Sequence, residues 1–103
     1  MVFNTGAALL DAIVLAVVSR TEEGTYGYKI TQDVRETIEV SESTLYPVLR
    51  RLQKDGCLEV YDRQYDGRNR RYYKVTLAGR EKLDMYRTEY MNKINQLFAG
   101  GEK

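Results

Sequence analysis

The clearest pattern along the chain is a helical stripe near its middle. Asp55-Gly56 ends this helix, and either Ser41 or Ser43 can cap its start. The apolar residues of the stripe recur at spacings of three and four, which places them on one side of a helix. They are Leu45, Val48, Leu49 and Leu52.

Two further helices are predicted before this one. Residues 7–18 are apolar almost all round apart from Asp11, which for a soluble helix indicates a central, buried position. After a polar loop, Thr25 can cap a shorter helix over residues 26–36, with Ile30 and Val34 on its inner side. Three helices in a row are therefore expected in the first half of the chain.

From residue 57 onward the apolar period changes to two, which predicts strands. Apolar side chains alternate in Leu58 and Val60, then in Tyr73 and Val75, on either side of a polar tip at residues 65–69 that contains a Gly. This pattern is typical of a β-hairpin. Thr76 can cap a final long helix over residues 77–98.

This order of elements predicts the fold class. Three helices, a hairpin and a long helix make a mainly α fold with a small β-hairpin, which is the layout of a winged helix-turn-helix followed by an extra C-terminal helix. We expect a DNA-binding domain over residues 1–76, a dimerisation helix over 77–99 and a flexible tail at 100–103. A chain of 103 residues is long enough for one core only.

Composition argues against catalysis and metal binding. The chain has no His, which removes the usual general base and the commonest metal ligand. Its one Cys, Cys57, cannot form an internal disulfide and fits a small buried residue. We therefore expect no enzyme activity, no metal and no cofactor.

The longest apolar run is too short to cross a bilayer, and residues 1–6 hold no Lys or Arg that a signal peptide would need. We expect a cytoplasmic protein without a membrane partner.

Charge is unevenly distributed, although the formal net charge is only +1. Residues 63–74 of the hairpin hold five cations and one acid, and Arg68, Arg70 and Arg71 flank the tip, where side chains can follow a phosphate backbone. The third helix adds hydroxyls, an aromatic ring and cations on its polar side, the groups that contact phosphates and base edges. That side consists of Ser43, Thr44, Tyr46, Pro47, Arg50, Arg51 and Lys54. On the helix alone, a merely solvated charged face explains the pattern equally well, whereas the hairpin cations favour DNA.

Pro47 interrupts the predicted third helix. With Ser43 as N-cap it is the fourth helical residue, where a backbone N–H should make the first helical hydrogen bond. Either the helix starts late, or a distortion presents Thr44 and Tyr46 outward.

The apolar stripe of the last helix is longer than a three-helix core can cover. One explanation is that the helix folds back on its own domain. A stripe shared with a second copy, packed against the apolar N-terminal helix, explains the length better and predicts a homodimer. The expected interface comprises Leu83, Tyr86, Tyr90, Met91, Ile94, Leu97 and Phe98. Two-fold symmetry would then predict an inverted-repeat operator.

Three segments of the chain carry a family resemblance. Residues 26–28 read Y-G-Y, residues 43–56 read S-T-L-Y-P-V-L-R-R-L-Q-K-D-G, and residues 67–79 read G-R-N-R-R-Y-Y-K-V-T-L-A-G. These motifs resemble the PadR family of transcriptional regulators over nearly the whole chain. The resemblance implies a homodimeric winged-helix repressor of the small subfamily with a single C-terminal dimerisation helix.

The resemblance also implies roles for individual residues. Tyr26 would touch a phosphate, and Arg50 would support the side chains that face the major groove. Those groove-facing residues would be Ser43, Thr44, Tyr46 and Pro47, with Arg68, Arg70 and Arg71 serving the wing.

Some members of the family bind planar drugs between aromatic residues of the two long helices. This chain has no Trp, and Tyr90 stands at the matching position. A pocket for a small aromatic inducer would be lined by Phe3, Leu10, Tyr86, Tyr90 and Met91, although core or interface packing explains these residues as well.

The sequence therefore predicts a transcriptional regulator that acts as a repressor and binds double-stranded DNA as a homodimer. Release by a small aromatic ligand stays an open alternative to a repressor that works without one. The alternative is a winged-helix module that binds protein instead of DNA, which would have no need for the arginine cluster on the wing.

Overall fold

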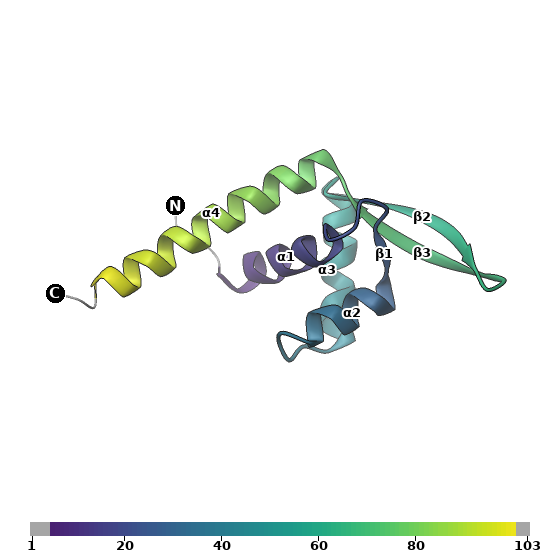
Figure 1. The fold of residues 1–103 in the computed structure, drawn as a ribbon, viewed down its shortest axis with the longest axis horizontal. Coiled ribbons are helices and arrows are strands. Elements are labelled where there is room, and N and C mark those ends of the chain that lie inside the picture. The colour runs from purple at the N-terminus through teal and green to yellow at the C-terminus, as the bar shows by residue number, and fades with distance from the viewer. Residues whose placement is uncertain (1–4, 101–103) are drawn as a thin grey trace.

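The N-terminal helix lies at the centre of the fold, as its uniform apolar character predicts. The computed structural model describes residues 5–100, and α1 (Thr5–Val18) contacts α2, α3, α4 and β3 (Figure 1). Its Val14, Leu15 and Val18 are completely buried. The core is completed by fully buried side chains from the next two helices: Ile30, Val34, Leu45, Leu49 and Leu52.

A short strand that the sequence pattern did not predict precedes the second helix. Thr25 was expected to cap that helix, and this was wrong: Thr25–Tyr26 forms β1, Tyr26 is the N-cap, and α2 spans Gly27–Arg35. Gly24 turns the chain into the strand with a φ of 86°. A Cβ at Gly24 would lie 2.0 Å from the carbonyl oxygen of Tyr73, so only glycine allows β1 to come this close to β3.

The third helix, α3 (Glu42–Lys54), begins earlier than the position of Pro47 suggested. Of the two candidate caps, Ser41 is the N-cap, and its hydroxyl lies 2.9 Å from that of Ser43 and 3.0 Å from that of Thr44. Of the two alternatives that Pro47 left open, the structure excludes a late start, because Pro47 lies inside the helix. Its missing N–H leaves the Ser43 carbonyl without a helical donor. Ser43 is exposed, so water can hydrate that oxygen.

The predicted hairpin forms the wing. Strands β2 (Leu58–Tyr65) and β3 (Arg68–Val75) pair antiparallel, and β1 adds to the other edge of β3 in a three-stranded sheet of order β1-β3-β2. The connection is tighter than the five-residue tip expected from the sequence, because Tyr65 pairs with Arg68. Asp66 and Gly67 both have positive φ, 52° and 75°, which is typical of the type I′ turn that matches the twist of a hairpin.

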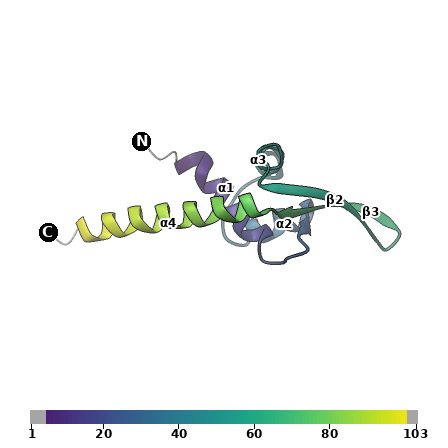
Figure 2. The ribbon, with the colours of Figure 1, turned by 90° about the horizontal axis from the view of Figure 1, so that it is seen from above.

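The last helix, α4 (Leu77–Gly100), begins as predicted with Thr76, whose hydroxyl accepts a hydrogen bond of 3.0 Å from the Gly79 amide. Its first half packs on α1, and this packing buries Leu83 and Tyr86 within their own chain. Its second half extends away from the body, opposite to the wing (Figures 1 and 2). Met91, Ile94, Leu97 and Phe98 are exposed there, by 43% to 78%.

The fold class is thus confirmed as a winged helix-turn-helix with an added long helix, and its sheet has three strands instead of two. Among the described residues, no helix is both long and apolar enough to span a membrane.

Candidate nucleic-acid interface

The outer side of α3 presents five of the seven α3 residues that the sequence assigned to DNA. Ser43, Thr44, Pro47, Arg50 and Lys54 are all exposed. Hydroxyl groups therefore lie at the N-terminal end of α3, and cations follow toward its C-terminal end. This order fits a helix whose N-terminal residues meet base edges while later side chains meet the backbone.

Arg51 lies apart from this set. Its guanidinium donates a hydrogen bond to the Asp11 carboxylate of α1, and it forms an ion pair with that buried side chain. The structure therefore gives Arg51 a partner on α1, within its own chain. Asp11 is a residue that functional reasoning from the sequence passed over, although a lone acid in an otherwise apolar helix was a signal that it needed a partner.

Tyr46 is half-buried and joins α3 to the start of α2. A Cβ at Gly27 would lie 3.2 Å from Cε1 of Tyr46 and 3.8 Å from Cε1 of Tyr73. Glycine at this position lets the Tyr46 ring come close to the N-terminus of α2. Tyr46 is therefore fixed by packing, whereas the sequence pattern placed it simply on the outer face of α3.

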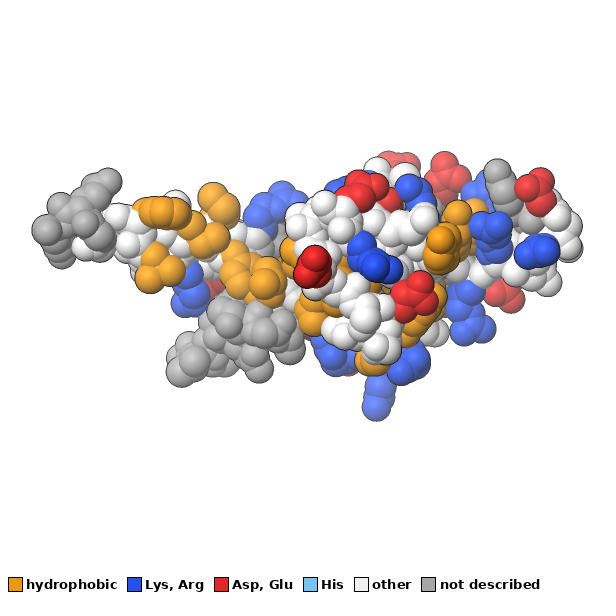
Figure 3. All heavy atoms as spheres, turned by 90° about the horizontal axis from the view of Figure 1, so that it is seen from below, with side chains coloured by type: hydrophobic (Ala, Val, Ile, Leu, Met, Phe, Trp, Pro, Cys, Tyr) orange, Lys and Arg blue, Asp and Glu red, His pale blue; other side chains and the backbone are white. Residues whose placement is uncertain are grey.

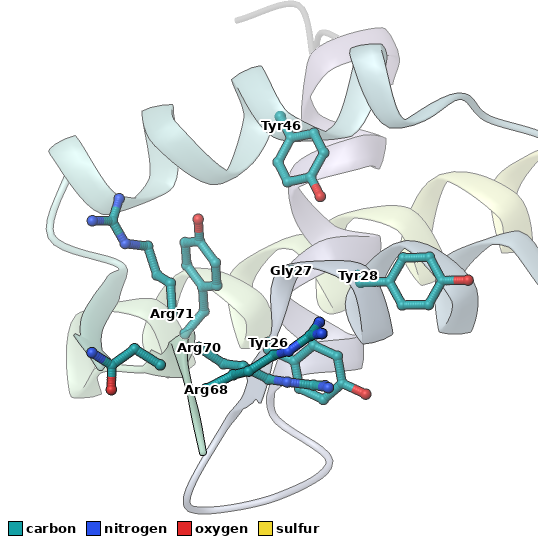
Figure 4. A pocket seen from close by; sticks show the side chains of 9 residues that line it. Tyr26, Gly27, Tyr28, Tyr46, Arg68, Arg70 and Arg71 are labelled. Carbon is teal, nitrogen blue, oxygen red and sulfur yellow. The ribbon is translucent and has the colours of Figure 1, made fainter. Parts of the chain in front are cut away.

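A groove of 540 Å³ lies between the start of α2, Tyr46 of α3 and the wing strand β3 (Figure 4). Aromatic rings and arginines make up most of its lining, a combination that suits an anionic, partly apolar partner such as a nucleic-acid backbone. The lining residues are Tyr26, Gly27, Tyr28, Tyr46, Arg68, Asn69, Arg70, Arg71 and Tyr73. Of these, Gly27, Tyr28, Asn69 and Tyr73 were not among the predicted contacts, because only the fold brings them to this place.

The three predicted wing arginines all line this groove, but their surroundings differ. Arg68 and Arg71 are exposed, while Arg70 is half-buried with its guanidinium 4.5 Å from the centre of the Tyr26 ring. Arg63, on β2, is instead paired with Glu23 at 3.2 Å.

Figure 3 shows Lys and Arg side chains around the wing, with some acids among them, and hydrophobic side chains along the far part of α4.

Tyr73 lies between the cations of α3 and those of the wing. Burial raises the pKa of its hydroxyl, against the opposing effects of Arg71 on β3 and Arg50 on α3. The hydroxyl therefore stays protonated at neutral pH and can donate a hydrogen bond. Arg50 of α3 and Arg71 of β3 therefore both act electrostatically on the Tyr73 hydroxyl.

The predicted inducer pocket is only partly described. Phe3 lies outside the described residues. Tyr86 belongs to the core, Leu10 and Tyr90 pack against it, and Met91 is exposed. Burial raises the pKa of the hydroxyl of Tyr86 and of Tyr90. Of the five predicted lining residues, the structure thus places Tyr86 in the core and Leu10 and Tyr90 half-buried against that core.

Within residues 5–100, no group of three His, Cys, Asp or Glu side chains is arranged to hold a metal ion, and Cys57 is buried. The polar groups that line the groove are phenol hydroxyls, guanidinium groups and the amide of Asn69.

These elements define the class of protein: a winged helix-turn-helix with a basic wing. The chain belongs to the transcriptional regulator PadR-like family, which it matches over residues 14–85. The family resemblance of the motifs is thereby confirmed, and the chain is a PadR family transcriptional regulator. This is a family of transcriptional regulators and not of enzymes.

Individual relatives extend this likeness. The transcriptional regulator Rv3488 of Mycobacterium tuberculosis is 48% identical over 76 residues, which cover 73% of this chain and 71% of Rv3488. The crystal structure of smu.1704 from Streptococcus mutans is 33% identical, with a TM-score of 0.85 over 99% of this chain and 94% of that one. Bacillus subtilis PadR, solved in complex with operator DNA, shares the fold at a TM-score of 0.65 and 22% identity, over 76% of this chain and 46% of that chain.

Proposed function

We propose that this protein is a sequence-specific regulator of transcription that represses its target genes by binding an operator as a homodimer. The observation that carries the proposal is the groove in which Tyr46 of α3, the start of α2 and the arginines of β3 line one concave surface. The B. subtilis PadR complex supports it, because a protein of the same fold was solved bound to operator DNA.

Affinity and specificity come from different parts of this surface. Arg68, Arg70 and Arg71 neutralise phosphates, which supplies affinity without reading sequence. Ser43 and Thr44 lie at the N-terminal end of α3, where side chains reach base edges in the major groove. The proposed contact of α3 with the major groove also includes Tyr46, Pro47, Arg50 and Lys54. The proposed contacts require no metal or cofactor, and the proposal is compatible with a cytoplasmic protein.

The second half of α4 supplies the dimer interface. Leu97 is 78% exposed and Phe98 is 75% exposed, and they follow Met91 and Ile94 along a helix that leaves the body of the protein. An apolar surface of this kind is stabilised when a second copy covers it. Two-fold symmetry would place two α3 helices for the two halves of an inverted repeat.

Release by a small aromatic ligand completes the proposed cycle. The candidate site lies where α1 and α4 pack together, with Tyr86 in the core and Leu10 and Tyr90 half-buried against that core. Titration with phenolic acids and planar cationic drugs, followed by Tyr fluorescence and by release of bound DNA, tests this part. A response in both signals supports an inducer, and silence in both leaves a repressor that works without one.

DNA recognition itself is tested with variants of the two parts. Binding to duplexes from upstream of the protein's own gene is measured by fluorescence anisotropy. Arg70→Ala with Arg71→Ala should weaken binding to all duplexes similarly, by at least tenfold if each arginine contributes about 1 kcal/mol to a phosphate contact. Thr44→Val should instead change the ranking of the duplexes.

A matched control removes two exposed arginines of α4, Arg80→Ala with Arg87→Ala, and should bind like the original chain. If the original chain binds no duplex at low salt, a winged-helix module that binds protein becomes the better explanation.

A further inference from the structure

Three tyrosines form a row across the sheet, at the base of the wing. Tyr72 of β3 lies directly opposite Tyr26 of β1 on one side and Tyr61 of β2 on the other. Ring centres are 5.7 Å apart for Tyr26 and Tyr72, and 5.6 Å apart for Tyr61 and Tyr72. These distances lie within the range of favourable aromatic pairs. Tyr26 is therefore held by its neighbours in the sheet as well as by the start of α2.

Two arginines extend this row toward the wing. Arg63 and Arg70 are directly opposite each other on β2 and β3, an arrangement that is unfavourable for like charges. Each guanidinium lies over a different ring: that of Arg63 is 5.4 Å from the centre of Tyr72, and that of Arg70 is 4.5 Å from the centre of Tyr26. Each guanidinium thus lies over a ring of the neighbouring strand, and the negative face of that ring stabilises the cation.

Arg63 and Arg70 differ in their surroundings. Arg63 is also paired with Glu23 on the preceding loop, at 3.2 Å, so its charge is partly neutralised. Arg70 lines the groove between α2, α3 and the wing, together with the ring on which it lies. Figure 4 shows Arg70 extending from the wing strand toward Tyr26 at the start of α2. Its charge is thus directed into the groove where the proposed function places DNA.

We propose that Tyr26 is a positioning residue for Arg70, acting through its ring. The family resemblance instead implied that the Tyr26 side chain touches a phosphate. A flexible arginine on a wing loses rotamer freedom when it binds a phosphate. With the guanidinium already resting on the Tyr26 ring, part of that loss has occurred before DNA arrives. This inference rests on the proposed function, and it has a consequence in the free protein as well.

The free protein gives the first test. Ring currents from Tyr26 should shift the side-chain protons of Arg70 upfield in the NMR spectrum, because the guanidinium lies over the face of the ring. The shift should persist in Tyr26→Phe and disappear in Tyr26→Leu. If the original chain shows no such shift, Tyr26 does not hold Arg70 and the inference is overturned, whether or not the protein binds DNA.

The second test is a double-mutant cycle on DNA affinity. Tyr26→Leu should weaken binding about two- to fivefold, the size expected of a cation–π contact at a partly exposed site. Tyr26→Phe keeps the ring and should recover most of that loss. In an Arg70→Ala background, Tyr26→Leu should have almost no further effect. In an Arg71→Ala background, which removes the neighbouring wing cation instead, its full effect should remain.

The cycle separates this role from its rivals. If Tyr26→Phe binds as weakly as Tyr26→Leu, the hydroxyl makes the contact, and the inference is wrong. An equal loss in the Arg70→Ala and Arg71→Ala backgrounds would mean that Tyr26 only stabilises the sheet, which also overturns it. If the original chain shows the NMR shift yet binds no duplex at low salt, the proposed function fails while the contact between Tyr26 and Arg70 stands.

Discussion

Asp11 and Arg51 show how a single buried charge constrains the helix that presents the DNA-binding side chains. Asp11 is 5% exposed in the apolar helix α1, and its carboxylate pairs with Arg51 of α3. Burying a carboxylate is costly unless it is paired. Arg51 is 43% exposed, so solvent screens the pair from one side. The ion pair therefore ties α3 to α1.

Removing Arg51 should destabilise the fold more than it weakens DNA binding. Arg51→Ala leaves Asp11 buried without its partner, and we expect a loss of about 2 kcal/mol in the free energy of unfolding, below the range for a fully buried pair because solvent screens this one. Lys54→Ala, at an exposed position of the same helix, should cost less than about 0.5 kcal/mol. Urea unfolding followed by circular dichroism measures both.

DNA affinity provides the check on this assignment. The folded Arg51→Ala variant should bind DNA nearly as well as the original chain. A large loss of affinity with unchanged stability would return Arg51 to the DNA contacts that the sequence pattern predicted.

The sequence predicted which side chains lie on the polar side of α3, but not what each one meets. Periodicity places Arg50 and Arg51 on the same helix, yet only Arg51 faces Asp11 in the structure. That pairing requires α1 and α3 to pack together, because Asp11 and Arg51 are 40 positions apart in the chain. Tyr46 and Gly27 are similar, since their contact requires two helices to meet. The local sequence pattern thus predicts which face of a helix a residue occupies, whereas tertiary packing determines which residue it contacts.

At the scale of elements, several close backbone contacts hold the joint between the wing and α4. The Thr76 hydroxyl donates to the Gly56 carbonyl at 2.6 Å and accepts from the Gly79 amide at 3.0 Å. The Thr76 amide also donates to the Cys57 carbonyl at 3.1 Å. A Cβ at Gly79 would lie 2.2 Å from that same carbonyl oxygen. The first turn of α4 is therefore packed directly on the start of β2.

Gly79→Ala should be destabilising, although alanine is normally the better helix former. The added methyl group would overlap backbone, which cannot move aside as a flexible side chain can, and we expect a loss of more than about 1 kcal/mol. Gly100→Ala is the matched control: it lies in the same helix with nothing within 4 Å of the added Cβ, and it should be neutral or slightly stabilising. Thermal unfolding compares them, and equal midpoints would contradict this packing.

Elements with strong local signals were predicted well. The apolar stripe, Thr76 as a cap and the alternation of the hairpin all led to the observed helices and strands. Strand β1 was missed because two residues carry no periodicity, and its pairing with Tyr72 and Tyr73 is a long-range contact. The effect of Pro47 on the start of α3 stayed open at the level of the sequence, because the hydration available to an exposed carbonyl is not visible in a sequence pattern.

The whole molecule is elongated, with different surfaces at its two ends. Its extents are 61 × 27 × 21 Å, with the wing at one end and the far half of α4 at the other. The net charge of +1 hides this arrangement. The sequence predicted both the basic wing and the apolar surface of α4 that its own core cannot cover. It could not predict that Leu83 and Tyr86 are buried within their own chain. The same apolar stripe packs on the core in the first half of the helix and is exposed in the second half, and the pattern does not mark where this change occurs.

Association through the far half of α4 is testable by light scattering. The original chain should have twice its mass of 12.0 kDa, and Leu97→Ser with Phe98→Ser should shift it toward the monomer because apolar contact area is lost. Leu77→Ser is the control: Leu77 is 75% exposed, as is Phe98, but lies at the other end of α4. A monomeric original chain at micromolar concentration would contradict the proposed homodimer.

The most direct test of DNA recognition by the basic wing is the dependence of affinity on salt. If the three groove arginines of each protomer each neutralise one phosphate, the slope of log K against log salt concentration should be about −5 for a dimer. Arg70→Ala with Arg71→Ala removes four of those contacts and should reduce the slope by about 3 to 4. An unchanged slope in this variant, or no binding of the original chain at low salt, would contradict DNA recognition through the wing.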